Sequence, residues 1–271
     1  MKKADKEMMN ELTLAVKYFL SKHPGNCLDE YPVPHITGDE NCVHRSTSES
    51  PAPHHVAAEA GQMSLCEFMM KITKDKNPGM KGWVMKGWTP LHSAAGGGHL
   101  LICSMIMDEI QNKNPGNEDG YTPLHAAARA GHLETFKMIM NKAGTDINPS
   151  DNEGFTPLHA AAWGGHMLMC SMIMNEIQDK NPGDEDGYTP LHEAAAGGHL
   201  ETFKMIMDKA RTEINPSDNE GWTPLHAAAK CDQREMCKFI ADRIENKNPE
   251  DNDGVTPQEL MWDNVCGIDN Y

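Results

Sequence analysis

Histidine and cysteine are the residue types in this chain that could bind a metal ion or act in catalysis. The sequence of 271 residues contains 14 histidines and 8 cysteines. One group outside any repeated pattern, Cys27, His35, Cys42 and His44, has the side chains that zinc accepts as ligands. No Cys-x-x-Cys pair occurs among them, and their spacing matches no standard zinc frame. A metal-binding N-terminal module is therefore the weaker alternative, and we predict no metal and no cofactor.

Most of the histidines recur at two fixed positions. Five close a Thr-Pro-Leu-His tetrapeptide, and four lie seven residues further on: His92, His125, His159, His192 and His226, then His99, His132, His166 and His199. A catalytic base or metal ligand need not recur with the architecture, so we interpret all nine as structural. The sequence also lacks a phosphate loop, a nucleophile elbow and a metalloprotease helix. We predict that the chain is not an enzyme.

The tetrapeptide marks the elements that carry these residues. It begins at Thr89, Thr122, Thr156, Thr189 and Thr223, and a degenerate copy begins at Thr256, so that spacings of 33 and 34 residues alternate. In the unit that begins near residue 184, Thr189 can cap a helix that starts at Pro190. A glycine pair ends that helix, and Leu200, Phe203 and Ile206 then follow at helical spacing. One unit cannot bury that apolar stripe alone, so neighbouring units must stack.

The tetrapeptide and its period resemble the ankyrin-repeat family over residues 49–271. The resemblance implies an all-α solenoid of stacked helix-turn-helix units with β-hairpin-like fingers. It also implies that the tetrapeptide histidines hydrogen-bond the turn threonine and the neighbouring backbone. We predict a degenerate unit at 49–83 and a half-unit cap at 251–271. The units between them begin at about residues 84, 117, 151, 184 and 218.

Two further expectations concern the ends of the chain and of the helices. Residues 1–48 carry no repeat, and we expect an amphipathic helix over residues 7–22 followed by a polar loop.

The repeat units alternate between two kinds, so that the true period is a pair of 67 residues, from Thr89 to Thr156. Ile110 and Ile177 stand where the family usually has a glycine, which predicts longer second helices in those two units.

A binding surface can be predicted by position from the family, in which fingers and first helices line a concave groove. An aromatic residue precedes the turn threonine in five successive units: Trp88, Tyr121, Phe155, Tyr188 and Trp222. Acidic residues precede the aromatics at the fingers: Glu118, Asp119, Glu153, Glu185, Asp186 and Glu220. The ends of three first helices break the repetition: Arg129, Trp163 and Lys230. We predict that these residues bind a protein or peptide, preferably a basic one. The alternative is that the aromatics brace the turns and the acids are only solvated.

The overall composition narrows the choice of partner and location. A formal net charge of -16 disfavours nucleic acid and anionic membrane surfaces. The cysteines lack the dense spacing of a disulfide scaffold, and we find neither a signal peptide nor a membrane-spanning run. We expect a monomeric scaffold or adaptor in the cytoplasm, with the nucleus as a second location. The alternative function is a regulatory ankyrin portion of a larger enzyme or channel.

Overall fold

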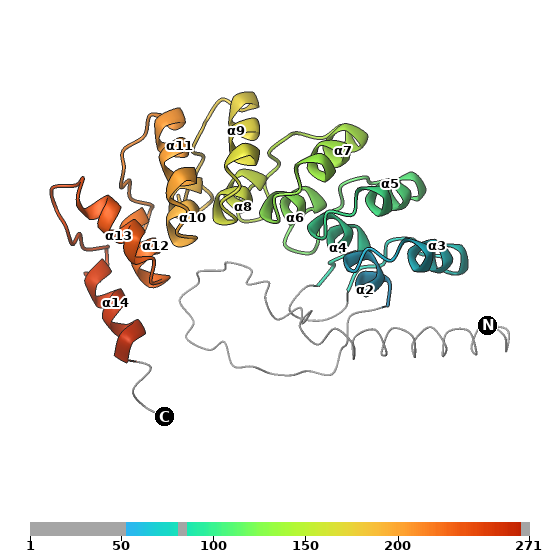
Figure 1. Ribbon diagram of the computed structural model, residues 1–271, viewed down its shortest axis with the longest axis horizontal. Helices are drawn as coiled ribbons and strands as arrows, with labels where there is room; N and C mark the ends of the chain where they lie inside the picture. The colour runs from blue at the N-terminus through green and yellow to red at the C-terminus, as the bar shows by residue number, and fades with distance from the viewer. Residues whose placement is uncertain (1–52, 81–85, 267–271) are drawn as a thin grey trace.

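The computed structural model describes residues 53–80 and 86–266, and within these ranges the chain forms a single curved row of helix pairs (Figure 1). The helix expected at residues 7–22 and the four-residue group from Cys27 to His44 lie outside the described residues. The described ranges contain helices and turns but no β-strand. The predicted all-α solenoid is confirmed, and its fingers are tight turns rather than paired strands.

Each unit contributes one short first helix and one second helix. The first helices are α2 (Pro53–Glu59), α4 (Pro90–Gly96), α6 (Pro123–Arg129), α8 (Pro157–Trp163), α10 (Pro190–Ala196) and α12 (Pro224–Lys230). The second helices are α3 (Met63–Ile72), α5 (Leu100–Glu109), α7 (Leu133–Ala143), α9 (Met167–Glu176), α11 (Leu200–Ala210) and α13 (Arg234–Ala241). The helix α14 (Pro257–Cys266) follows the degenerate tetrapeptide. From α4 to α12, first helices line the inner side of the arc and second helices the outer side (Figure 1).

The start of each first helix is fixed by side chains that satisfy its free backbone N–H groups. In α4 the hydroxyl oxygen of Thr89 accepts the backbone N–H of His92, and Nδ1 of His92 accepts the backbone N–H of Thr89 at 3.1 Å. The side chain of Asn77, from the preceding loop, accepts the N–H of Leu91 at 2.9 Å. The same three groups recur at α6, α8, α10 and α12. The Asn-Pro dipeptide of each linker is therefore a helix cap.

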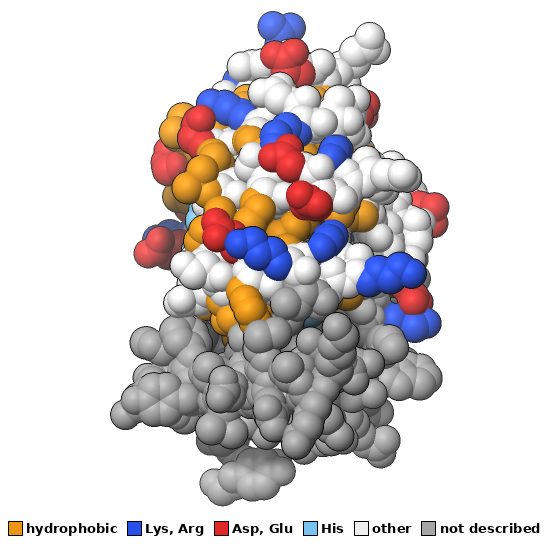
Figure 2. Space-filling model, turned by 90° about the vertical axis from the view of Figure 1, so that its right-hand side faces the viewer, with side chains coloured by type: hydrophobic (Ala, Val, Ile, Leu, Met, Phe, Trp, Pro, Cys, Tyr) orange, Lys and Arg blue, Asp and Glu red, His pale blue; other side chains and the backbone are white. Residues whose placement is uncertain are grey.

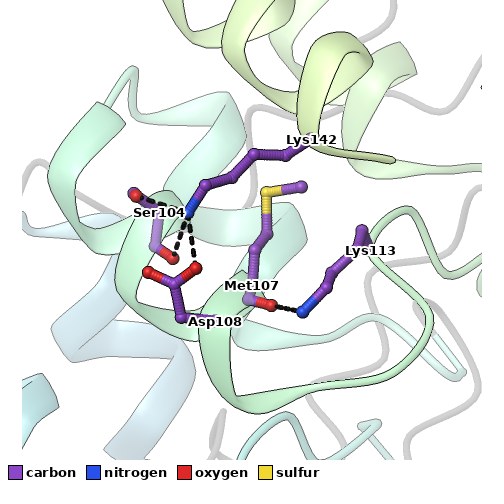
Figure 3. Close-up of polar contacts among 5 residues, drawn as sticks. All are labelled: Ser104, Met107, Asp108, Lys113 and Lys142. Carbon is purple, nitrogen blue, oxygen red and sulfur yellow. Dashed lines mark hydrogen bonds and ion pairs between the residues drawn. The ribbon is translucent and has the colours of Figure 1, made fainter. Parts of the chain in front are cut away.

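The second helices end in two ways, and the expectation of longer helices in two units is wrong. The helices α5 and α9 have 10 residues and stop before Ile110 and Ile177, which are extended, whereas α7 and α11 have 11. A lysine in the following loop caps α5, because Lys113 donates to the carbonyl of Met107 (Figure 3). Lys180 caps α9 in the same way, because it donates to the carbonyl of Met174. A left-handed residue instead ends α7, where Gly144 has a φ of 60°.

The core runs continuously along the row. From α4 to α12, alanines and one leucine of each first helix are buried, which lets neighbouring first helices approach closely. Larger side chains of the second helices, such as Phe136, Ile173 and Phe203, fill the space behind them. Methionines including Met107 and Met174 are also fully buried, as expected for flexible thioethers that fill gaps between units.

The second helices are joined in pairs. The helices α5 and α7 contact each other closely, and so do α9 and α11, whereas the contact between α7 and α9 is much smaller. Lys142 of α7 reaches across to α5, where its ammonium contacts Ser104 Oγ at 2.8 Å and Asp108 Oδ1 at 2.7 Å (Figure 3). Lys209 makes the equivalent contacts from α11 to α9. The 67-residue pair in the sequence is therefore also a pair in the packing.

Candidate functional site

The candidate site is the inner face of the arc, formed by the fingers and the first helices. Each finger is a tight turn closed by hydrogen bonds within the turn and by one to the neighbouring finger. In the finger before α8, the N–H of Asp151 donates to the carbonyl of Phe155 at 2.8 Å, and the Asp151 carboxylate accepts the N–H groups of Glu153 and Phe155. The N–H of Glu185, in the next finger, donates to the carbonyl of Glu153 at 2.9 Å. Such bonds give the row of fingers a fixed spacing.

The five aromatic residues stand at the base of the fingers, each beside the histidine of its own unit. Ring centroids of Tyr188 and His192 are 4.6 Å apart, and the other four units show separations of 4.7 to 5.8 Å. Phe155 and Tyr188 are each only 8% exposed. Trp88, Tyr121 and Trp222 are half-buried and pack against the core. All five aromatic rings therefore support the turns from inside, and in three of the five units part of the ring is also exposed.

The tetrapeptide histidines connect successive units. Nε2 of His125 contacts the carbonyl of Phe155 in the next unit at 3.1 Å, while its Nδ1 accepts the N–H of Thr122. The carbonyl can only accept, so Nε2 carries the proton and the ring is neutral. Burial lowers the pKa of His125 to about 3 and that of His92, His159 and His192 to about 4. These rings hold the row together and are not available as ligands or bases.

The acidic finger residues are all exposed: Glu118, Asp119, Glu153, Glu185, Asp186 and Glu220. Glu118 pairs with Lys86 at 2.7 Å, and both side chains are more than half exposed. Behind the tips, burial raises the pKa of Asp184 to about 6 and also raises that of Asp218. The inner edge of the finger row is therefore acidic along its length.

The three side chains that break the repetition lie at the C-terminal ends of first helices. Arg129 ends α6, Trp163 ends α8 and Lys230 ends α12. The guanidinium of Arg129 lies over the Trp163 ring, 5.5 Å from its centroid. Arg129 and Trp163 are half-buried, and Lys230 is exposed. The structure brings Arg129 and Trp163 together and places Lys230 two units from Trp163.

Sequence reasoning missed one residue on this face, Glu193 of α10. It is 3% exposed, and burial raises its pKa to about 8. The sequence alone marks Glu193 as an exception to the repeat. In the other complete copies the residue after the tetrapeptide histidine is serine or alanine, for example Ala160 and Ala227. His55 of the degenerate unit was also missed as a connecting histidine: its Nε2 contacts the carbonyl of Trp88 at 2.9 Å.

Two other kinds of site are absent from the part of the chain that the structure describes. Within residues 53–80 and 86–266, no three His, Cys, Asp or Glu side chains are grouped so that they could hold a metal ion. Five cysteines in these ranges are free thiols, and burial raises the pKa of Cys103 and Cys170 to about 12. Of the helices in the same ranges, none combines the length and apolar character needed to cross a membrane.

Comparison with known proteins agrees with this architecture. The family model described as "Ankyrin repeats (3 copies)" matches the chain in overlapping segments, at residues 54–151, 111–184, 142–218 and 170–253. No curated protein matches the chain. The family match spans most of the sequence and covers all six helix pairs, five of which carry the tetrapeptide. The chain belongs to the ankyrin-repeat family.

Proposed function

We propose that this chain is an interaction scaffold that holds a protein partner with a basic, partly apolar surface against its inner face. Ankyrin repeats are in general protein-protein interaction modules. The observation that carries the proposal is the break in repetition on that face. The units repeat the same caps, finger bonds and core, yet Arg129, Trp163 and Lys230 differ from their counterparts at one helix position. Side chains that the fold does not require to be alike are free to select a partner.

Charge supports a basic partner. The exposed finger acids line one edge of the inner face, and the whole chain carries a formal charge of -16. Such a field raises the rate of encounter with basic proteins more than it raises affinity. By contrast, the side nearest α3 and α5 shows acidic and basic side chains intermingled around small hydrophobic areas (Figure 2). The inner face is the better candidate because its acids and its aromatic edges are adjacent.

Affinity capture from a cell extract tests this proposal with three forms of the full chain. The first is wild type, and the second carries Arg129→Ala, Trp163→Ala and Lys230→Ala. The third is a matched outer-face control, Leu101→Ala with Leu168→Ala, two side chains that are 69% and 72% exposed. Phe155 and Tyr188 are left intact, because truncating buried rings costs about 3–5 kcal/mol of stability.

The expected result is a basic protein that wild type and the outer-face control retain and that the inner-face variant loses. The purified partner should then bind the inner-face variant at least about tenfold more weakly than wild type, as expected when hot-spot residues are truncated. Equal retention by all three forms would contradict the proposed inner face. Loss only from the outer-face control would move the binding surface to the second helices.

A further inference from the structure

We propose that Glu193 is an anchoring residue on the inner face, which receives an arginine side chain from the partner beside Tyr188. This inference rests on the proposed function, since it names the chemistry that the inner face recognises. It concerns a residue that the repeat framework does not require, because serine or alanine fills the same place in the other complete copies of the tetrapeptide.

The first observation is a pair of polar groups left without partners. Within the described residues, neither Oε2 of Glu193 nor the hydroxyl of Tyr188 has a hydrogen-bond partner. Both side chains are more than nine-tenths buried, at 3% and 8% exposed. A buried polar group without a hydrogen bond destabilises the folded chain, and more so when it is charged. Two such groups close together in one protein therefore need an explanation.

The second observation is that these groups belong to one cluster, assembled from four successive first helices, α6 to α12, and the finger before α10. Tyr188 packs with Ala196 and Ala227, and Trp163 and Cys231 pack against them. Glu193 lies three residues before Ala196 on α10, so the two residues share one side of that helix. Burial is the main cause that raises the pKa of Tyr188 and of Cys231, and the charge of Glu193 adds to both shifts. We call Glu193, Tyr188, Trp163, Arg129 and Cys231 the Glu193 cluster.

The electrostatics of the cluster favour a cation. Burial is the main cause that raises the pKa of Glu193, the positive charge of Arg129 opposes it, and the negative charge of Asp184 adds to it. A second guanidinium beside the carboxyl group would supply the hydrogen bonds that Oε2 lacks. A cation would also favour the ionised form of Glu193, whose pKa burial raises to about 8. An anionic ligand would instead oppose that ionisation and would meet the acidic fingers, and like charges in a desolvated site are strongly unfavourable.

An arginine fits better than a lysine for two reasons. Its planar guanidinium has five N–H donors in a fixed fork, so it can donate to Oε2 of Glu193 and to the hydroxyl of Tyr188 together. It also stacks on aromatic rings, and the Trp163 ring already carries the guanidinium of Arg129 at 5.5 Å. Trp163 is half-buried and packs against the group formed by Tyr188, Ala196 and Ala227, so we infer that its side chain moves to admit the partner.

A random library of displayed 12-residue peptides, selected on the intact chain, supplies the probe. Recovered peptides are synthesised and their affinities measured for wild type, Glu193→Ala, Glu193→Gln and Trp163→Ala. The control is Glu176→Gln, an exposed acid at the end of the outer helix α9. Each peptide is also made with its arginine replaced by citrulline, which has the same shape without the charge. Glu193→Ala installs the residue that Ala160 and Ala227 already provide at the same position, and thermal unfolding verifies that each variant is folded.

The expected peptides share one essential arginine. Their affinity should fall at least tenfold for Glu193→Ala, for Glu193→Gln and for Trp163→Ala, and should stay within twofold for Glu176→Gln. Replacing the peptide arginine by citrulline should also weaken binding to wild type at least tenfold. The same replacement should barely change binding to Glu193→Ala, because the arginine and Glu193 interact with each other.

Three outcomes would overturn the anchor. They are peptides that need Trp163 but bind Glu193→Ala unchanged, peptides that need no arginine, and no recovery above background. None of them bears on the capture experiment with Arg129, Trp163 and Lys230, so the proposed function can stand when the anchor fails. The proposed function fails separately, when the inner-face variant retains the same cellular proteins as wild type.

Discussion

At the scale of the residue, the tetrapeptide histidine is a connector with two different ends. Its Nδ1 accepts a hydrogen bond inside its own unit, and its Nε2 donates to the next unit, as His125 does to Phe155. Both bonds require a neutral ring. In α14 the position is held by Glu259, whose carboxylate accepts the N–H and hydroxyl of Thr256 at 2.9 Å. A carboxylate can close the cap but cannot donate to a following carbonyl, which suits a half-unit.

The free energy of unfolding should therefore fall as the solution is acidified below pH 6.5. A histidine has a pKa near 6.5 in the unfolded chain, whereas burial lowers it to about 4 for His92, His159 and His192. Between these values the unfolded chain binds more protons, so each such ring contributes a loss of about 1.4 kcal/mol per pH unit. Urea unfolding at pH 7.5, 6.0 and 5.0 measures this loss. A free energy of unfolding that is flat over this range would contradict the neutral-ring account.

Glu193 should have the opposite dependence on pH. Its folded pKa of about 8 lies above the ordinary value of 4.5, so the folded chain holds the proton more tightly and stability falls as pH rises from 4.5 to 8. Without a partner, Glu193→Ala should be more stable than wild type at pH 7, by up to about 3 kcal/mol. Urea unfolding of both forms at pH 5 and pH 7 tests this, with Glu153→Gln as the control. A variant that is less stable at pH 7 would mean that the carboxyl group is satisfied in the free chain.

At the scale of the element, the left-handed positions show where the backbone alone demands glycine. Gly144, which ends α7, has a φ of 60°, and a Cβ added there would meet nothing within 4 Å. Gly131, between α6 and α7, has a φ of 75°, and its added Cβ would lie 2.4 Å from Nδ1 of His166. Gly144 is therefore needed only for its left-handed backbone, whereas Gly131 is also needed because the His166 ring leaves no room for a side chain.

Three substitutions should therefore destabilise the chain in a fixed order. Gly144→Asn should cost least because asparagine tolerates the left-handed region. Gly144→Ala should cost about 1 kcal/mol, and Gly131→Ala should cost more because the His166 ring must also shift. Denaturant midpoints of the three variants measure the order. Equal losses at Gly144→Ala and Gly131→Ala would contradict the packing between Gly131 and His166.

The sequence predicted the elements well and their ends less well. The tetrapeptide fixed each first helix because threonine, proline and histidine act locally, within three residues. The ends of α5 and α9 were predicted wrongly because they depend on a lysine six residues beyond the carbonyl that it caps, as between Lys113 and Met107. The missing glycine at Ile110 is replaced by a different cap, not by a longer helix.

At the scale of the whole molecule, the curvature follows from small first helices on the inside and longer second helices on the outside (Figure 1). The tight row of α4 to α12 gives the inner face one continuous surface, while the pairs α5 with α7 and α9 with α11 group the outer helices. The positions of the inner-face residues were predictable from the repeat. Their burial was not, because whether Phe155 or Tyr188 is covered depends on how closely neighbouring units stack.

The central claim is that the partner lies on the inner face, and hydroxyl-radical footprinting of the full chain with its captured partner tests it most directly. Trp163 and Trp222 report on the inner face, and Met167 and Leu168, which are 43% and 72% exposed, report on the outer helices. The account predicts that the bound partner slows oxidation of Trp163 severalfold and leaves Met167 and Leu168 unchanged. Protection of Met167 and Leu168 with no change at Trp163 would contradict it.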